Sequence, residues 1–289
     1  MCGAPAGKRY SLDVAASEHP RLRVAALQLS SQADVAENLA KIEALVTEAA
    51  QRGAELALLP ENFAYFGPEG GKREFAERLG DLEAPVQRAL KQLATRLRIG
   101  ILAGGFAERS SDAERPFNTS LLLTRDGEVT AVYRKIHLFD VDLRAQGSAC
   151  ESLTTTPGSD VVVAPFAGFN LGLSICYDLR FPELYRKLVE RGADVLTVPA
   201  AFTQYTGKDH WHVLLRARAI EAQSYVVAPA QWGKHPENRL TFGHALIVDP
   251  WGTVIAEASD RVGFVIADVE RNFLDEVRSR IPSLQNRRL

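Results

Sequence analysis

The sequence predicts an α/β fold, because strand-like and helix-like hydrophobic patterns alternate along the chain from Arg23 onwards. Hydrophobic content is 46% and charged content 24%, which is ordinary for a globular chain that buries a large core. A chain of 289 residues has room for two domains, but no change in composition marks a boundary. We therefore predict a single domain over residues 21–289, preceded by a flexible leader over residues 1–20.

The first half of the predicted domain begins with a strand over residues 24–29 and a helix over 34–52. That helix places Leu39, Ile42 and Val46 on one face, and Gly53 follows its end. The other elements expected here are strands over residues 56–59, 99–106, 120–124 and 129–133 and a helix over 84–98. Asp126 and Gly127 separate the last two strands, as in a tight hairpin.

The second half repeats the alternation. Strands are expected over residues 161–164, 171–175, 195–198, 245–248, 254–256 and 264–267, and helices over 182–191 and 208–223. Pro182 suits the first position of its helix, and Gly192 lies just past the end. The helix over 208–223 combines an apolar stripe with arginines, a pattern that fits either a core-packing helix or a subunit interface.

Cys176 directly follows an apolar strand and precedes a helical segment. A cysteine on such a turn projects its sulfur into a cleft, where backbone N–H groups and the positive end of a helix favour a thiolate. A lone cysteine is more often a small buried core residue, so the local run by itself leaves both interpretations open.

Two distant segments favour the catalytic interpretation. Glu61 and Lys135 each follow an apolar strand-like run, where burial is expected and charge is costly. A carboxylate, an ammonium and a thiol at strand ends supply the base, the oxyanion stabiliser and the nucleophile for acyl transfer to water. Taken singly, Glu61 and Lys135 each fit solvated charges at the ends of strands better than catalytic groups.

Bulk properties exclude several classes of partner. The formal net charge of −2 gives no electrostatic case for nucleic acid or an anionic membrane, and no apolar run is long enough to span a bilayer. Three cysteines, one in the leader, do not form a disulfide framework, which favours a reducing compartment and a cytoplasmic location. No metal site is expected at the four histidines His210, His212, His235 and His244, because no cysteine or carboxylate cluster joins them at ligand spacing.

Three motifs carry a resemblance to a known family: LPENF at 59–63, YRKIHL at 133–138 and CYDLRFPE at 176–183. With them the chain resembles the nitrilase superfamily of carbon–nitrogen hydrolases from about Arg23 to its end. It is most similar to the Nit branch, whose members include deaminated-glutathione amidases and ω-amidases. The resemblance implies a four-layer αββα sandwich of two mostly mixed sheets, a homodimer or higher homo-oligomer stacked through helical faces, and no cofactor.

The same resemblance implies roles for particular residues. Glu61 would act as base, Cys176 as nucleophile, and Lys135 with the Tyr177 N–H as oxyanion donors, while Glu151 would orient the lysine and the substrate nitrogen. Side chains expected to line the substrate cleft are Tyr177, Phe63, Phe202 and Thr203. Arg180 and Asp178 are expected to form a structural pair at the nucleophile turn, with binding of a substrate carboxylate as the alternative. Cys150 is expected to be an inert loop residue, with a redox role as the alternative.

The expected function is hydrolysis of a small non-peptide amide to carboxylate and ammonia through a Cys176 thioester, with deaminated glutathione as the leading substrate. An ω-amidase, a nitrilase or an N-carbamoyl hydrolase of the same superfamily is the first alternative. The second is a dimeric scaffold without catalysis, against which the intact set Glu61, Lys135, Glu151 and Cys176 argues, because such buried charges are costly to keep.

Overall fold

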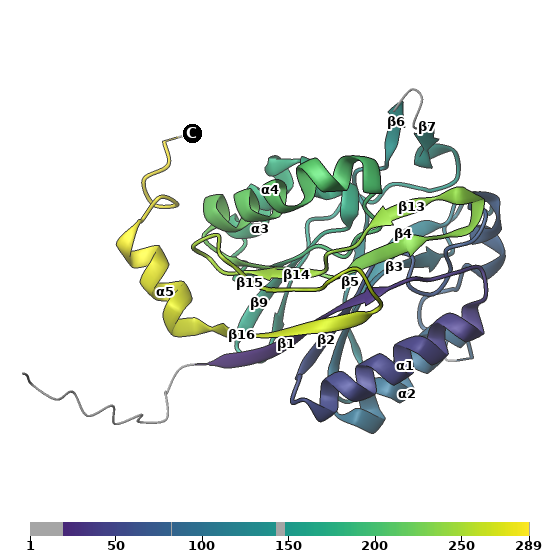
Figure 1. Cartoon of the computed structure of the whole chain (residues 1–289), viewed down its shortest axis with the longest axis horizontal. Helices are drawn as coiled ribbons and strands as arrows, with labels where there is room; N and C mark the ends of the chain where they lie inside the picture. The colour runs from purple at the N-terminus through teal and green to yellow at the C-terminus, as the bar shows by residue number, and fades with distance from the viewer. Residues whose placement is uncertain (1–19, 82, 143–147, 289) are drawn as a thin grey trace, which may run out of the picture.

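The computed structural model describes residues 20–81, 83–142 and 148–288, so that most of the predicted leader lies outside the described residues. Helices and strands alternate along most of the chain, as predicted (Figure 1). The helices are α1 (Val35–Gln51), α2 (Pro85–Leu97), α3 (Pro182–Glu190), α4 (Gln204–Ala222) and α5 (Arg271–Arg280). The strands are β1 (Arg21–Leu29), β2 (Leu56–Leu59), β3 (Gly100–Glu108), β4 (Phe117–Leu123), β5 (Val129–Arg134), β6 (Asp140–Asp142), β7 (Ser148–Cys150), β8 (Val163–Phe166), β9 (Phe169–Leu173), β10 (Val195–Thr197), β11 (Tyr225–Ala228), β12 (Ala230–Lys234), β13 (Leu240–Phe242), β14 (Leu246–Val248), β15 (Val254–Glu257) and β16 (Gly263–Glu270).

Two large mixed sheets form the centre of the molecule. The first has eight strands in the order β13-β12-β1-β2-β3-β4-β5, with β16 paired to β1, and the second has six strands in the order β15-β14-β11-β10-β9-β8. Within them β1, β2 and β3 run parallel, and so do β9, β10 and β11. The carboxyl ends of each parallel set therefore lie together at one edge, which is where binding sites of such sheets usually form.

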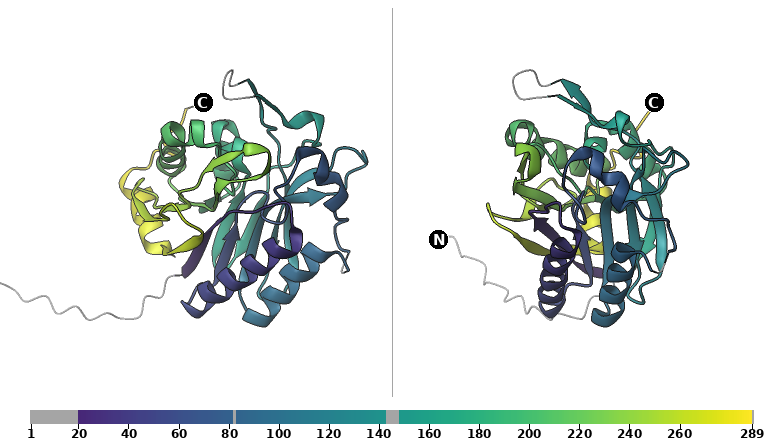
Figure 2. Two further views of the ribbon diagram at one scale, coloured as in Figure 1. Left: turned by 45° about the vertical axis from the view of Figure 1, so that its right-hand side comes forward. Right: turned by 90° about the vertical axis from the view of Figure 1, so that its right-hand side faces the viewer.

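The two sheets pack face to face because their strands bury both faces. On β1, Val24 and Ala26 belong to the core shared with the second sheet, whereas Ala25 and Leu27 belong to a separate core beneath α1 and α2. Helices α3 and α4 cover the outer face of the second sheet, so that Figures 1 and 2 show four layers. This arrangement confirms the predicted αββα sandwich.

Several elements differ from the prediction. Helix α4 begins at Gln204, four residues before its expected start, and β11, β12, β13 and α5 had not been predicted. Three of these missed elements are strands of three to five residues separated by Pro229 or by polar turns, too short for a hydrophobic period to show. The turn at Cys176 is a 3-10 helix over Cys176–Arg180, and α3 begins after it at Pro182.

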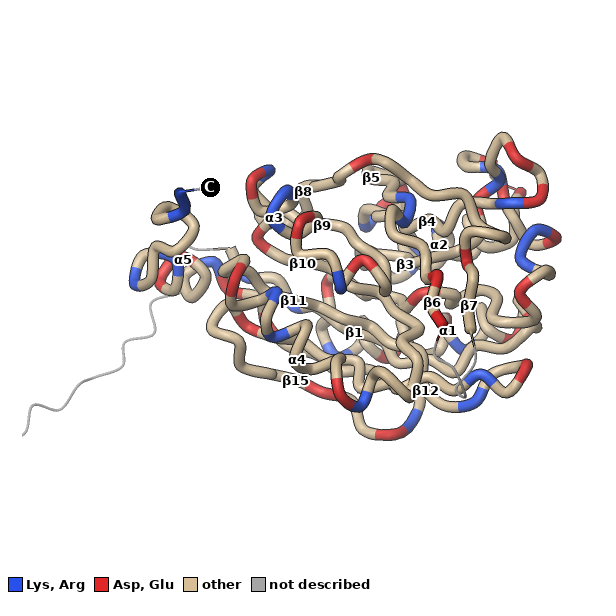
Figure 3. Tube along the Cα trace, turned by 90° about the horizontal axis from the view of Figure 1, so that it is seen from above, with Lys and Arg blue, Asp and Glu red and all other residues tan. Residues whose placement is uncertain are grey.

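Charged residues of both signs are interspersed along the described chain, as Figure 3 shows. This distribution agrees with the small net charge. Within the described residues, no helix is both long enough and apolar enough to cross a membrane.

Candidate active site

The ends of several strands bring Glu61, Lys135 and Cys176 together. Glu61 follows β2 of the first sheet, Lys135 follows β5, and Cys176 follows β9 of the second sheet. The segment after β10 links them, because the Cys176 N–H donates to Pro199 O at 2.9 Å and the Ala201 N–H donates to Glu61 Oε2 at 3.0 Å. The candidate site therefore lies between the two sheets, at the carboxyl ends of their parallel strands.

Lys135 is buried between two carboxylates. Its Nζ donates to Glu61 Oε1 at 2.9 Å and to Glu151 Oε2 at 2.8 Å. Burial lowers the pKa of Lys135, but the charges of Glu151 and Glu61 outweigh it and leave the pKa well above its usual value. Burial raises the pKa of Glu151, yet Lys135 and Lys72 bring it below its usual value. The geometry thus holds an ammonium and an ionised Glu151 side by side.

Asn118 is a member of the site that the sequence analysis missed. Its Nδ2 donates to Glu61 Oε1 at 2.9 Å and approaches Glu151 Oε1 at 3.4 Å, while its backbone carbonyl accepts from the Lys135 N–H. Gly105 makes room for it, because a Cβ there would lie 2.6 Å from Asn118 Oδ1 and 3.0 Å from Glu61 Cγ. The only sequence signal was a polar run, Asn118-Thr119-Ser120, just before three leucines of the same strand.

Cys176 sits in a constrained backbone conformation, with φ of 47° in the left-handed region that non-glycine residues rarely adopt. Burial and then the neighbouring Glu61 charge raise the pKa of its thiol well above the usual value. This direction runs against the expectation that the turn favours a thiolate, because desolvation and Glu61 outweigh Lys135 and the Ala201 N–H. A thiol that stays protonated beside a carboxylate needs that carboxylate as its base.

Asp178 anchors the nucleophile turn to the lysine segment. Its fully buried carboxylate accepts hydrogen bonds from the Tyr133 hydroxyl at 2.6 Å, the Ile175 N–H at 2.9 Å and the His137 N–H at 3.0 Å. The His137 ring also contacts it, with Nδ1 2.7 Å from Asp178 Oδ1. The predicted pair of Asp178 with Arg180 is wrong, since these donors saturate the carboxylate from elsewhere.

Arg180 instead lies among the residues predicted to line the cleft. Its guanidinium carbon is 5.0 Å from the centre of the Phe202 ring and 5.9 Å from that of Tyr177, and Nη1 is 3.3 Å from His210 Nδ1. No carboxylate of the described residues forms an ion pair with it. The structure therefore brings Tyr177, Phe202 and Arg180 together beside the nucleophile turn.

Thr203 and Phe63 have different surroundings. Thr203 precedes α4, and its hydroxyl is 2.8 Å from that of Thr206. Phe63 has no exposed surface and packs in the core beneath α1 and α2, with its ring 6.3 Å from that of Phe106. The prediction that Phe63 lines the substrate cleft is not supported, because a side chain without exposed surface offers a substrate no contact area.

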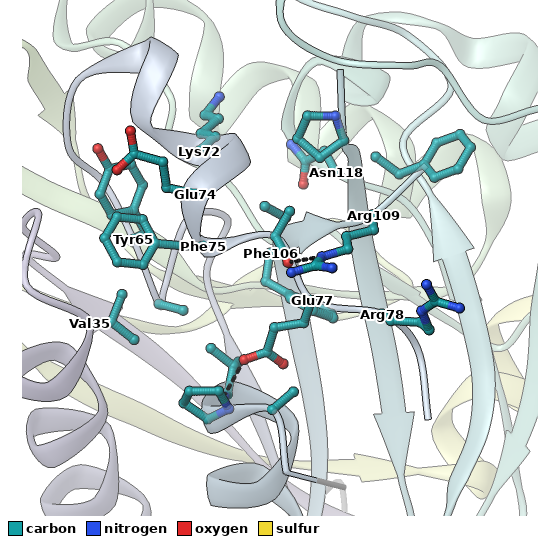
Figure 4. A pocket seen from close by; sticks show the side chains of 18 of the residues that line it. Val35, Tyr65, Lys72, Glu74, Phe75, Glu77, Arg78, Phe106, Arg109 and Asn118 are labelled. Carbon is teal, nitrogen blue, oxygen red and sulfur yellow. Dashed lines mark hydrogen bonds between the residues drawn. The ribbon is translucent and has the colours of Figure 1, made fainter. Parts of the chain in front are cut away.

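A cavity of about 340 Å³ adjoins the site (Figure 4). Asn118 belongs to its wall together with Tyr65, Lys72, Phe75 and Phe106, whereas Glu61, Lys135, Glu151 and Cys176 do not. This cavity lies beside the charged cluster, with Asn118 shared between them.

The histidines fall into three different environments. His235 is buried, with Nδ1 2.8 Å from Ser31 O and Nε2 2.7 Å from Thr241 Oγ1, and burial lowers its pKa to about 4. His210 is exposed and contacts Arg180. His212 and His244 both contact Glu257, so the stated reason for expecting no metal site, that no carboxylate joins the histidines, is wrong. These contacts join residues 45 and 13 positions apart, which meet only in the fold.

Cys150 has an exposed side chain, and its sulfur is 3.6 Å from Ser152 Oγ. Cys176 is a free, buried thiol. A redox role for Cys150 stays a prediction.

Comparisons with known proteins agree with the motifs. Residues 23–279 match the family model described as carbon-nitrogen hydrolase. The chain is 48% identical over 266 residues to a deaminated glutathione amidase of Synechocystis sp., covering 91% of this chain and 97% of that protein. It is 42% identical over 294 residues to the deaminated glutathione amidase of Homo sapiens, covering 100% of this chain and 88% of that one.

Solved structures show the same fold. The Caenorhabditis elegans NitFhit protein superposes with a TM-score of 0.87 at 36% identity, covering 93% of this chain and 66% of that longer one. Nit3 of Saccharomyces cerevisiae, described as a member of branch 10 of the nitrilase superfamily, has a TM-score of 0.85 at 28% identity, covering 93% and 97%. These similarities confirm the resemblance that the three motifs indicated.

Proposed function

Because the chain belongs to the carbon–nitrogen hydrolase family, we propose that Cys176 is the nucleophile of its reaction, Glu61 the proton acceptor and Lys135 the oxyanion donor. The protein is a hydrolase of carbon–nitrogen bonds other than peptide bonds, with amidases among its relatives. The observation that carries the proposal is that the three side chains are buried next to one another. Lys135 Nζ lies 2.9 Å from Glu61 Oε1, and Glu61 is close enough to Cys176 to raise the pKa of its thiol.

In the first half-reaction, Glu61 accepts the thiol proton as the Cys176 sulfur attacks the amide carbonyl carbon. The carbonyl π electrons move to oxygen, giving a tetrahedral oxyanion. When it collapses, the C–N bond breaks, Glu61 returns the proton to the nitrogen, and a thioester remains. In the second half-reaction, Glu61 accepts a proton from water as the water attacks the thioester. Collapse then breaks the C–S bond and releases the carboxylic acid, and Glu61 returns its proton to the Cys176 sulfur.

Lys135 and the Tyr177 N–H are the proposed donors to the oxyanion. An ammonium held in advance by Glu61 and Glu151 needs little reorganisation when negative charge develops. Glu151 is the proposed positioning residue, because it binds Lys135 Nζ and also accepts from the Phe139 N–H at 2.7 Å. Asn118 contacts both carboxylates through its Nδ2.

Deaminated glutathione is the proposed substrate, on the basis of the two amidases that cover nearly the whole chain. The Arg180 guanidinium supports a substrate that carries a carboxylate, since it lies between Tyr177 and Phe202 without a carboxylate partner among the described residues. Both amide bonds of deaminated glutathione are secondary, so either would release an amine. The ammonia expected from the sequence would come from a primary amide such as α-ketoglutaramate, not from deaminated glutathione.

Product analysis by mass spectrometry tests this function. The panel is deaminated glutathione, α-ketoglutaramate, an N-carbamoyl amino acid and a simple nitrile, assayed with the parent, Cys176→Ala and, as a matched control, Cys150→Ala. Turnover of deaminated glutathione that Cys176→Ala abolishes and Cys150→Ala retains is expected. Turnover of another compound would keep the mechanism and overturn the substrate. No turnover at all, with equal binding by the parent and Cys176→Ala, would favour the scaffold.

The homodimer is also proposed, through the outer face of α4. Tyr205, Val213 and Ile220 are 50%, 66% and 51% exposed along this helix, and Trp251 is 52% exposed in the turn beside it. The turn adjoins the helix, because Arg216 Nε donates to Gly252 O at 2.7 Å. Exposed apolar side chains gathered in this way mark an interaction surface. The cytoplasmic location, which suits a thiol nucleophile, stays a prediction.

Light scattering tests the dimer. Val213→Glu places a charge on the proposed face and is expected to give monomers, whereas Val129→Glu, on β5, is expected to leave the parent's dimer intact. A monomeric parent, or a Val213→Glu variant that remains dimeric, would contradict this interface.

A further inference from the structure

A second cluster of metal-ligating side chains lies outside the candidate active site. It comprises His212 on α4, His244 in the link between β13 and β14, and Glu257 at the end of β15. His212 Nε2 is 2.8 Å and His244 Nδ1 2.7 Å from the same oxygen, Glu257 Oε1. One ligand atom from each residue lies within 4.8 Å of the other two. None of these residues has a part in the proposed hydrolysis.

The backbone around the cluster is fixed. His244 has φ of 56°, and its carbonyl accepts a hydrogen bond at 2.8 Å from the indole N–H of Trp211, the buried neighbour of His212. The His244 ring stacks on Phe242, with centres 4.4 Å apart, and Phe242 meets the His212 ring edge-on at 6.0 Å. The two imidazoles are thus held toward one carboxylate by the contacts of a helix and a loop.

We propose that His212, His244 and Glu257 form a binding site for a divalent transition-metal ion, with Zn²⁺ as the preferred occupant. Two imidazole nitrogens and a carboxylate oxygen are a ligand set that Zn²⁺ takes with a water in the fourth position. All three side chains are about one-third exposed or less, which leaves solvent access for that water. Hard cations such as Mg²⁺ prefer sites made of oxygen ligands, so this set discriminates against them.

The present distances suit hydrogen bonds and need a small adjustment for a metal. Zinc–ligand bonds of about 2.0–2.2 Å in a tetrahedron place neighbouring ligand atoms roughly 3.3 Å apart. Glu257 therefore has to withdraw by roughly half an ångström, which its position at the exposed end of β15 permits. The histidine nitrogens that face Glu257 would bind the metal through their lone pairs and so carry no proton in the bound state.

Asp260 supplies the outer contact that a ligating histidine usually has. Its Oδ1 is 3.4 Å from His244 Nε2, the ring nitrogen that faces away from Glu257. A carboxylate on the remote nitrogen fixes the tautomer and raises the basicity of the ligating nitrogen. An ion at this site would fasten α4 to the β14–β15 hairpin, so its expected role is structural.

Zinc binding by the full chain tests the proposal. The parent for the test carries Cys176→Ala, which removes the buried thiol as a competing ligand. After treatment with a chelator, it is dialysed against Zn²⁺ and the bound metal is measured by mass spectrometry. His244→Gln and Glu257→Gln are compared with His210→Gln, a control that removes another α4 histidine, and circular dichroism confirms that each variant is folded.

The expected result is one Zn²⁺ per chain in the parent and in His210→Gln, with a higher melting temperature when zinc is present. His244→Gln and Glu257→Gln are expected to lose the ion and the temperature shift. Asp260→Asn is expected to weaken binding about tenfold, at the lower end of the range for outer contacts because Asp260 is exposed. Equal binding by His244→Gln, Glu257→Gln and the parent, or no retained zinc in the parent, would overturn the proposal.

Discussion

Two charged clusters of this molecule share a design and differ in burial. In the active-site cluster, Lys135 lies between Glu61 and Glu151, and the three side chains are 2%, 5% and 8% exposed. In the second cluster, His212 and His244 share Glu257, and the three side chains are 34%, 26% and 34% exposed. Water solvates each member of the second cluster if a partner is lost, whereas the buried charges depend on one another. Burial, rather than contact distance, decides how strongly each cluster is coupled.

The largest effect is expected at the buried thiol. Cys176→Ala removes the nucleophile, so hydrolysis of the substrate should fall by at least about 10⁴-fold. Product formation measured by mass spectrometry checks this, with Cys150→Ala retaining activity because its side chain is exposed and outside the cluster. Substantial hydrolysis by Cys176→Ala would exclude a thioester mechanism.

Lys135→Met should affect both rate and stability. The loss of one oxyanion donor costs about 10²–10³ in kcat. Leaving Glu61 and Glu151 buried without their cation costs about 3–5 kcal/mol of unfolding free energy, measured by urea denaturation. Lys41→Met, which removes an exposed lysine from its pair with Glu37, is the matched control and should be nearly neutral. A loss no greater than that of Lys41→Met would break the comparison of the two clusters.

His235 extends the comparison to a single buried group. Its folded-state pKa of about 4 lies below the usual 6.5, so the unfolded chain binds more protons between these values. Its contribution to stability is therefore complete above pH 6.5 and is lost as the pH falls toward 4, by about 3 kcal/mol at most. Denaturation of the parent and of His235→Gln across this range measures the difference, and parallel curves would contradict the prediction.

The smallest effect is expected at the partly exposed cluster of His212, His244 and Glu257. Glu257→Gln, measured in a chelating buffer, should change the unfolding free energy by less than about 1 kcal/mol, because water replaces the lost contacts with His212 and His244. Urea denaturation of this variant beside Lys135→Met gives the comparison directly. A loss as large as that of Lys135→Met would show that exposure does not weaken the coupling.

Much of the fold could be predicted from local pattern. Helices α1, α2 and α3 were predicted within one residue of their ends, because the 3.6-residue period, Pro182 and the flanking glycines act within a few residues. Strands β11 and β13 were missed because three or four residues carry too little period, and the sheet around them, rather than their own sequence, stabilises them. The family motifs indicated Glu61, Lys135 and Cys176, and the structure brings these side chains together.

By itself, the sequence determined most of the element types, the sandwich implied by its motifs, and the candidate catalytic residues. Only the tertiary structure decided that Asn118 joins the two carboxylates and that Phe63 is a core residue. It also decided that Asp178 pairs with Tyr133 and His137 rather than with Arg180. The meeting of Glu257 with two histidines is likewise a result of the fold. The fold also places the pKa of the Cys176 thiol above its usual value rather than below it. The physical reason is that these properties depend on burial and on partners up to dozens of residues away along the chain. The stacking of the two sheets determines both the burial and the partners, and no local sequence pattern encodes them.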